Sequence, residues 1–109
     1  ASDVYKRQNY NIIMDTIRFE WDENKAATNQ QKHGITFQEA ATVFQDEDAL
    51  QIFDPDHSED EDRFILLGMS SILRILVVCH CYRANDDVIR IISARKATRN
   101  ESSTYKRRK

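Results

Sequence analysis

Three runs of apolar and β-branched residues, joined by short links, dominate the second half of this 109-residue chain. They cover residues 63–68, 73–82 and 88–95, and their composition is typical of β-strands. A parallel crossover needs a long connection, so links this short predict antiparallel pairing between neighbouring runs. Asn85 and Asp86 fit the hairpin loop between the last two runs.

Two Thr-x-x-Glu patterns indicate where helices begin. Thr36 with Glu39, and Thr98 with Glu101, each match a capping box, in which the Thr and Glu side chains bond to each other's backbone amides. We therefore expect one helix to begin near Thr36 and the final helix to run from Thr98 to about residue 107.

The remaining elements complete an α+β fold. Residues 17–21 are expected to form the first strand, and residues 22–32 a helix that ends before Gly34, a natural residue for the left-handed position after a helix. Residues 50–53 are expected to form another strand. The predicted order is βααββββα, an antiparallel sheet with two N-terminal helices and one C-terminal helix.

The first 13 residues are set apart from this fold. Residues 3–8 correspond to one reading frame of a transposon-end sequencing adapter, so we expect residues 1–13 to be a non-native, disordered leader. Residues 14–109 then form a single domain, long enough for one modest core. No apolar run approaches the roughly 18–20 residues of a membrane span. The two cysteines, Cys79 and Cys81, are expected to be free thiols, which favours a cytoplasmic location.

Charge is distributed unevenly along the chain. The formal net charge is −2, but residues 39–62 hold ten acidic residues and no Lys or Arg. Residues 90–109 hold eight basic residues and one acid. A solvated, uneven surface explains this pattern without a function. The functional alternative is that the basic end attracts a polyanion and the acidic segment attracts a basic protein.

Lys32 and His33 fall in the last turn of the first predicted helix. The helix dipole favours an imidazolium at this end. Bonding to the last helical carbonyls would explain the same position. Proton transfer is the functional alternative.

A second candidate cluster runs from His57 to Arg63. It places a histidine, several carboxylates and an arginine within seven residues. Such a set can supply an acid/base group, for which Glu61 is a candidate, and an anion ligand, Arg63. A solvated acidic loop with a local ion pair is the alternative. Neither EF-hand spacing nor a second Cys/His pair is present, so no metal and no cofactor are expected.

The third cluster stands where the last strand meets the last helix. Arg95 and Lys96 occupy the strand exit, and Arg99 follows in the helix. The planar guanidinium of arginine suits phosphate, and lysine offers a compact charge. A solvated basic helix end is the alternative.

These clusters belong to three motifs that together span residues 17 to about 105. The motifs are Phe19-Glu20-Trp21-Asp22 with Lys25, Asn29, Lys32-His33-Gly34-Ile35 and Phe37; His57-Ser58, Arg63-Phe64 and Gly68; and Ile91-Ile92-Ser93-Ala94-Arg95-Lys96-Ala97-Thr98 with Glu101 and Tyr105. In this order and spacing they resemble the BrnT-type toxins of bacterial type II toxin–antitoxin modules. Ser102-Ser103 departs from the more basic helix expected there.

The resemblance implies a RelE-like fold and an endoribonuclease whose RNA cleavage arrests translation. It also implies a BrnA-like antitoxin that neutralises the toxin and binds DNA, so that the complex represses its own operon. RNA carries its own nucleophile, the 2′-hydroxyl. Cleavage therefore needs proton transfer and stabilisation of the phosphorane, but no metal.

On this interpretation each candidate has a role. Arg63 and Arg95 hold the scissile phosphate, with Lys96 assisting. His33, with Lys32 beside it, transfers a proton, and Glu61 is the alternative base or the group that orients it. Four further residues are candidates for binding RNA, two of them by stacking on bases. These are Trp21 or Tyr105, which would stack, and Lys25 and Arg99. For Trp21, packing against the first helix is the favoured alternative.

Two other functions compete with this one. Two short helices around Gly34 have the outline of a helix-turn-helix, but the second helix lacks Lys and Arg, and phosphate contacts dominate DNA affinity. A catalytically inert module that binds only an antitoxin or a nucleic acid is the other alternative. RNA cleavage in the presence of EDTA would separate an enzyme from an inert binder.

Overall fold

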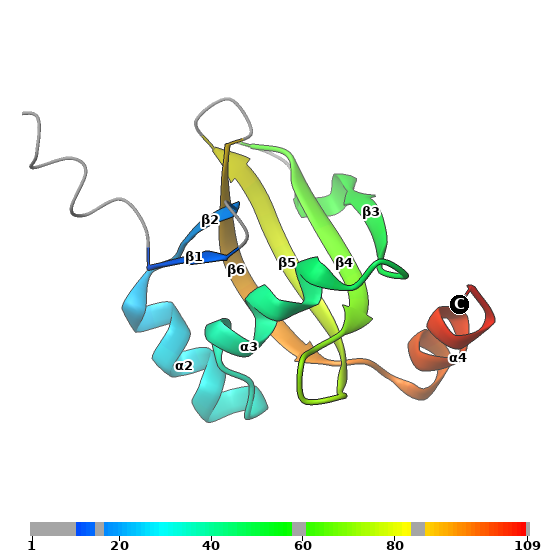
Figure 1. The fold of residues 1–109 in the computed structure, drawn as a ribbon. Helices are drawn as coiled ribbons and strands as arrows, with labels where there is room; N and C mark the ends of the chain where they lie inside the picture. The colour runs from blue at the N-terminus through cyan, green and yellow to red at the C-terminus, as the bar shows by residue number, and fades with distance from the viewer. Residues whose placement is uncertain (1–10, 15–16, 58–60, 84–86, 109) are drawn as a thin grey trace, which may run out of the picture.

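The computed structural model describes residues 11–14, 17–57, 61–83 and 87–108 (Figure 1). The predicted Asn85-Asp86 loop lies outside these residues. The fold is α+β, and its elements from Ile17 onward follow the expected order of one strand, two helices, four strands and a final helix. A short additional strand precedes them. The RelE-like description remains a prediction.

One six-stranded sheet organises the molecule, with the strand order β1-β2-β6-β5-β4-β3. The two edge strands are therefore β1 and β3, and β6 lies near the middle although it comes last in the chain. The strands are β1 (Ile12–Met14), β2 (Ile17–Glu20), β3 (Leu50–Asp54), β4 (Arg63–Met69), β5 (Ile75–Arg83) and β6 (Val88–Lys96).

The sheet is mixed, so the prediction of a purely antiparallel sheet is wrong at one position. Strands β3 to β6 pair antiparallel, as their short links require. Strand β2, however, pairs parallel with β6, with Arg18 opposite Val88 and Glu20 opposite Arg90. The argument from short links did not apply to this pair, because two helices and three strands separate β2 from β6 along the chain.

The boundary expected at residue 14 falls inside a strand. Ile12–Met14 pairs antiparallel with Ile17–Phe19 of β2. The side-chain carbonyl of Asn11 accepts a hydrogen bond of 2.9 Å from the backbone N–H of Trp21. Residues 12–13 are therefore part of the described sheet, and Asn11 is hydrogen-bonded beside it. A non-native origin of residues 1–13 remains a prediction.

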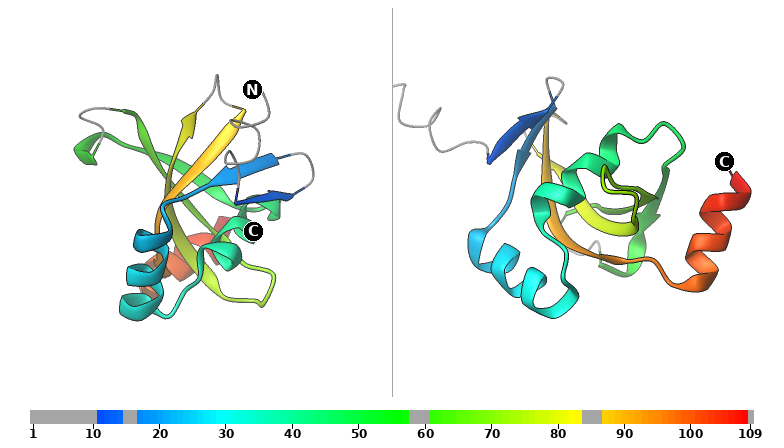
Figure 2. Two further views of the ribbon diagram at one scale, coloured as in Figure 1. Left: turned by 90° about the vertical axis from the view of Figure 1, so that its left-hand side faces the viewer. Right: turned by 60° about the horizontal axis from the view of Figure 1, so that its bottom comes forward.

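The two faces of the sheet carry different helices (Figures 1 and 2). Helices α2 (Glu23–His33) and α3 (Phe37–Thr42), with the 3₁₀ turn η1 (Val43–Gln45), cover the larger core. Helix α4 (Arg99–Arg108) packs elsewhere, through Tyr105 against Leu67 and Val77. Adjacent residues Leu66 and Leu67 point to opposite faces and join these two clusters respectively. None of the described helices is long and apolar enough to cross a membrane.

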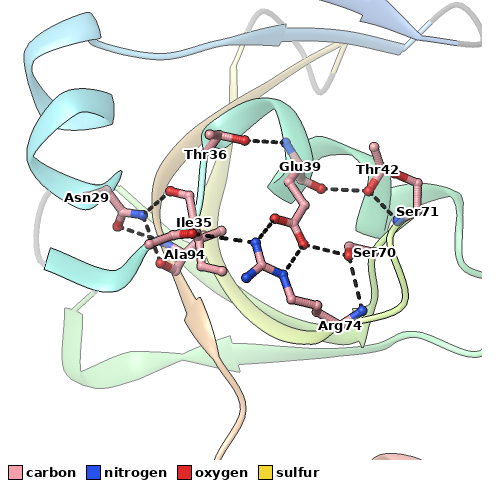
Figure 3. Close-up of polar contacts among 10 residues, drawn as sticks. Asn29, Ile35, Thr36, Glu39, Thr42, Ser70, Ser71, Arg74 and Ala94 are labelled. Carbon is pink, nitrogen blue, oxygen red and sulfur yellow. Dashed lines mark hydrogen bonds and ion pairs between the residues drawn. The ribbon is translucent and has the colours of Figure 1, made fainter. Parts of the chain in front are cut away.

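The first capping box forms only in part (Figure 3). The backbone N–H of Glu39 donates to Thr36 Oγ1 at 3.0 Å, as predicted. The Glu39 carboxylate, however, turns inward, where it accepts a hydrogen bond from Ser70 Oγ at 2.7 Å and pairs with the Arg74 guanidinium. The hydrogen bond from Arg74 lowers the pKa of Glu39. The partly exposed guanidinium of Arg74 therefore outcompetes the local cap for this carboxylate.

This network holds the turn between β4 and β5 against α3. The Arg74 guanidinium also lies 3.5 Å from the carbonyl of Gly34, the left-handed residue that ends α2 with φ of 72°. The turn carries Leu73, which is 78% exposed and has a φ of 66°, a conformation unfavourable for a non-glycine residue. The Glu39–Arg74 ion pair thus fixes a turn that its own backbone would not favour.

Candidate active site

The middle of the candidate site is an irregularity in the β5–β6 ladder. Cys79 pairs with Ser93, whereas the next residue, His80, pairs with Ile91, so Ile92 is an additional residue on β6. A β-bulge of this kind bends a strand and redirects side chains, and bulges are frequent beside functional sites. Here the bulge lies where two clefts meet.

The first cleft lies on the face that α4 covers only in part. It has a volume of about 280 Å³ and is lined by residues of four neighbouring strands. Arg63 and Arg95, the two predicted phosphate ligands, both line it. The full lining is Asp54, Arg63, Ile65, Val77, Cys79, Ile92, Ser93 and Arg95.

Arg95 is held in place by the second capping box. Its guanidinium donates to both carboxylate oxygens of Glu101, at 2.8 and 3.0 Å. Glu101 also accepts from the backbone N–H of Thr98 at 2.8 Å, and the Glu101 N–H donates to Thr98 Oγ1 at 3.2 Å. The box is therefore complete, as predicted. The hydrogen bond from Arg95 is the main cause that lowers the pKa of Glu101 to about 2.

This pairing leaves Arg95 able to bind an anion. A guanidinium has five N–H groups. Two donate to Glu101 and one lies 3.3 Å from the carbonyl of Lys96. The remaining N–H groups of Arg95 would donate to an anion in the cleft. The Arg95 side chain is 41% exposed, so solvent and ligand can reach it.

The second cleft lies between α2 and β6 and has a volume of about 340 Å³. It gathers three predicted residues on one helix, Lys25, Lys32 and His33. Lys32 and His33 lie in the last turn of α2. Asp22 caps the start of this helix, and its side chain accepts a hydrogen bond of 3.1 Å from the Lys25 amide. The lining is Asn24, Lys25, Thr28, Asn29, Lys32, His33, Ile92 and Ser93.

Asn29 fixes α2 beside β6 (Figure 3). Strand β2 pairs with β6 only as far as Arg90, so no strand among the described residues pairs with this edge of β6 beyond that point. The Asn29 amide takes the place of a strand: it donates to the Ala94 carbonyl at 2.9 Å and accepts from the Ala94 N–H at 3.0 Å. It also donates to the Ile35 carbonyl at 3.0 Å. One buried side chain therefore sets the position of the basic helix end relative to Arg95.

The two clefts share Ile92 and Ser93 and so adjoin at the bulge. The fold thereby brings together two sets of predicted residues that lie far apart in the sequence. One set is the Lys32 and His33 pair on α2, and the other is the Arg63 and Arg95 pair on β4 and β6. We call the joined surface the β6 groove.

Other predicted residues lie outside the β6 groove. Lys96 follows Arg95 on the strand and points to the opposite face, where its charge acts on Glu39. Glu61 lies 3.6 Å from Arg83, and its charge, after burial, raises the pKa of the Cys81 thiol to about 11. Arg99 is exposed on the first turn of α4. The geometry therefore does not support Lys96 as a partner of Arg95, or Glu61 as a base in the groove.

The two candidate stacking residues are buried, which agrees with the packing alternative for Trp21 and argues against stacking by Tyr105. Trp21 is 6% exposed, packs edge-on against Phe37 with ring centroids 5.9 Å apart, and donates its indole N–H to Glu23 at 3.2 Å. Tyr105 is 1% exposed and donates to Asp46 Oδ2 at 2.6 Å. Neither ring presents a face on which a base could stack.

The sequence interpretation missed three residues of the Arg63–Arg95 cleft. Asp54 faces Arg63 across β3 and β4, Ser93 is exposed at the bulge, and Cys79 is half-buried beside them. Burial raises the pKa of the Cys79 thiol, which keeps it protonated. The pattern of alternation could have placed Cys79 and Arg63 on one face, but Ser93 required the register of the bulge. Residues 58–60 of the predicted cluster between His57 and Arg63 lie outside the described residues.

Comparisons with known proteins identify the family of the chain. A model of the BrnT ribonuclease toxins of type II toxin–antitoxin systems matches residues 21–101. The chain belongs to the BrnT toxin family. A solved structure, the Brucella abortus ribonuclease toxin BrnT at 1.1 Å resolution, is similar with 25% identity and a TM-score of 0.55. The similarity covers 74% of this chain and 96% of the Brucella chain. No curated protein matches the sequence.

Membership of the BrnT family accounts for the main motifs found in the sequence. The matched region contains every residue of the β6 groove and ends at Glu101, the partner of Arg95. The family is described as ribonuclease toxins, so an RNA substrate and an antitoxin partner follow for this toxin.

Proposed function

We propose that this BrnT-family toxin is a metal-independent endoribonuclease whose active site is the β6 groove. The observation that carries the proposal is the meeting of the two clefts at Ile92 and Ser93. It joins an arginine pair, suited to phosphate, to a helix end that carries a histidine and a lysine. These are the groups that cleavage by a 2′-hydroxyl requires.

In the proposed mechanism Arg63 and Arg95 bind the scissile phosphate from two strands. Their charges stabilise the extra negative charge of the phosphorane, and one well-placed donor is worth about 10²–10³ in rate. His33 takes the proton of the 2′-hydroxyl or returns one to the leaving 5′-oxygen, an effect worth about 10²–10⁴. Lys32 lies beside it, and Lys25 binds the RNA backbone along α2.

The cellular consequence we propose is inhibition of translation through RNA cleavage in the cytoplasm. A BrnA-like antitoxin would neutralise the toxin, and the complex would bind operator DNA through the antitoxin. Family membership supports these points. An inert binding module is the alternative, and the bidentate contact of Glu101 with Arg95 is the observation that favours it.

The test uses purified protein and RNA in the presence of EDTA. We expect cleavage by the wild type, and a loss of about 100-fold or more in rate for Arg63→Ala and for Arg95→Ala. Arg107→Ala removes an exposed charge from α4, outside the groove, and should stay within about twofold. A thermal unfolding measurement on each variant tests whether it is folded.

Each possible result has a distinct meaning. RNA binding without cleavage would identify the inert module. Cleavage that disappears in EDTA and returns with a divalent ion would overturn metal independence. Full activity of both arginine variants would overturn the phosphate assignment. A cell-free translation assay with the same variants then tests whether cleavage is the cause of translation arrest.

A further inference from the structure

The edge strand β3 has the features of a docking strand. It ends the strand order, and no described strand pairs with its outer side. An edge strand presents unpaired backbone N–H and C=O groups, and natural edges are usually protected by charge, proline or a covering element. Asp54 and Pro55 lie only at the end of β3, and within the strand Ile52 and Phe53 are each 47% exposed. Because successive side chains alternate, this edge is apolar on both faces.

The Phe53 ring belongs to a row of packed aromatic rings. Its centroid lies 5.6 Å from that of Phe64, which lies 5.4 Å from that of Tyr82. The Tyr82 hydroxyl donates to Gln51 Oε1 at 2.6 Å, which ties β5 back to β3. An anchor ordered before binding loses little conformational entropy on association, so Phe53 is suited to be a binding hot spot.

The charge around β3 selects the partner. The strand lies within residues 39–62, which contain ten acidic residues and no Lys or Arg. Glu47 and Asp56 are exposed, and Asp48 and Asp54 are half-buried. RNA would be repelled by this surface. A second copy of the chain, paired antiparallel edge to edge, would bring two acidic segments together. A basic protein segment is the complementary occupant.

We propose that β3 is the docking strand for the antitoxin, which adds an extended segment of alternating apolar and basic residues to this edge of the sheet. The proposal rests on the proposed function, because it assumes a neutralising partner. Addition of a strand to a sheet edge is a general mode of peptide recognition, in which the backbone gives affinity and alternate side chains give specificity.

This location also suggests how binding would inhibit the toxin. Ile52 and Asp54 pair with Ile65 and Arg63 of β4, and Asp54, Ile65 and Arg63 line the first cleft. Side chains on that face of an added strand would therefore extend toward the arginine pair. The antitoxin would then cover the phosphate-binding end of the β6 groove.

The experiment uses the full-length toxin and its purified cognate antitoxin. Hydrogen exchange of the wild-type toxin is measured with and without antitoxin, and Kd is measured for Ile52→Lys and Phe53→Lys. Ile72→Lys is the matched control, since Ile72 is 61% exposed on the β4–β5 turn, away from β3. RNA cleavage by each free toxin is measured separately.

We expect new protection in residues 50–54, a rise in Kd of at least about tenfold for the two β3 variants, and less than about twofold for Ile72→Lys. Affinity should fall as salt rises, because the acidic surface contributes to it. Free Phe53→Lys should still cleave RNA but escape neutralisation.

Other results would overturn the docking proposal. Protection confined to β1 or α4, or a larger loss for Ile72→Lys, would place the antitoxin elsewhere. A toxin dimer abolished by Phe53→Lys would assign the edge to a second copy, and loss of RNA binding would assign it to RNA. The exchange measurement decides even if a β3 variant fails to fold. If the wild type binds at β3 but cleaves no RNA, only the proposed function fails.

Discussion

The two Thr-x-x-Glu boxes of this toxin have the same sequence pattern but different structures. At Thr98 the box is complete, and Glu101 adds a bidentate contact to Arg95 in the β6 groove. At Thr36 only the Thr half forms, and Glu39 turns into the protein to meet Ser70 and Arg74. The carboxylate follows the stronger partner, because hydrogen bonds to a guanidinium are about twice as strong as neutral ones.

The difference teaches that one local motif can serve stability or function according to its surroundings. Glu39 is 8% exposed and connects α3 to the β4–β5 turn, so its loss should lower the free energy of unfolding of the whole domain. Glu101 is about one-third exposed and connects α4 to a groove arginine. It should influence RNA cleavage more than unfolding.

The largest expected effect comes from neutralising each carboxylate in turn. Glu39→Gln should lower the free energy of unfolding by about 1–3 kcal/mol, because charge-assisted hydrogen bonds in a partly buried site lose the charge of their acceptor. Glu101→Gln should cost less than about 1 kcal/mol, since exposed ion pairs contribute little. Its main effect should be a fall in cleavage rate of about tenfold, as Arg95 loses its fixed orientation.

Urea denaturation and RNA cleavage measured on both variants check this contrast. A folded Glu39→Gln should keep nearly wild-type activity. The comparison would break if Glu101→Gln raised the cleavage rate, since Glu101 would then compete with the phosphate for Arg95 rather than position it.

An acid titration should give a smaller effect that sharpens the same comparison. The Arg74 and Arg95 contacts lower the pKa of Glu39 and Glu101 respectively, the latter to about 2. Between about pH 4.5 and 2 the unfolded chain binds more protons than the folded one at these sites. Stability is therefore full above about pH 5 and declines as pH falls through the folded pKa values.

Trp21 is the only tryptophan and is buried, so its fluorescence reports unfolding across this range. The stability difference between wild type and Glu39→Gln should shrink as the pH falls. A difference that stays constant down to pH 2 would mean that Glu39 is not charged in the folded protein.

The smallest expected effect concerns Tyr105, which lies on α4 near the complete box. Tyr105→Phe removes the hydroxyl that donates to Asp46 and keeps the buried ring. We expect a loss of about 1 kcal/mol in unfolding free energy and unchanged RNA cleavage. A substantial fall in RNA affinity in a folded variant would restore the stacking role that burial argues against.

Local rules predicted the parts of the fold that depend on neighbours in sequence. The β3–β6 meander followed from short links, and α2 ended at Gly34 as expected from its left-handed φ of 72°. The Thr98 box was predicted completely. Arg63 and Arg95 were also found from the sequence, because charged residues at strand ends stand out, and both line the first cleft.

Features that depend on distant pairing were missed or wrong. The parallel β2–β6 pair and the strand-like contact of Asn29 with Ala94 join segments at least 65 residues apart. The bulge at Ile92 depends on the register between β5 and β6. Side-chain burial decided the cases of Trp21 and Tyr105, since an aromatic residue stacks on RNA only where tertiary packing leaves its ring exposed.

The sequence by itself therefore determined the element types, the helix starts and the BrnT-like motifs, because capping, turn chemistry and short-link pairing are local. Only the tertiary structure decided the long-range arrangement: the clefts of His33 and Arg95 adjoin at the bulge, Glu39 pairs with Arg74, and Lys96 lies on the face opposite Arg95. The physical reason is that strand register has a period of two, so one additional residue in β6 changes which side chains share a face.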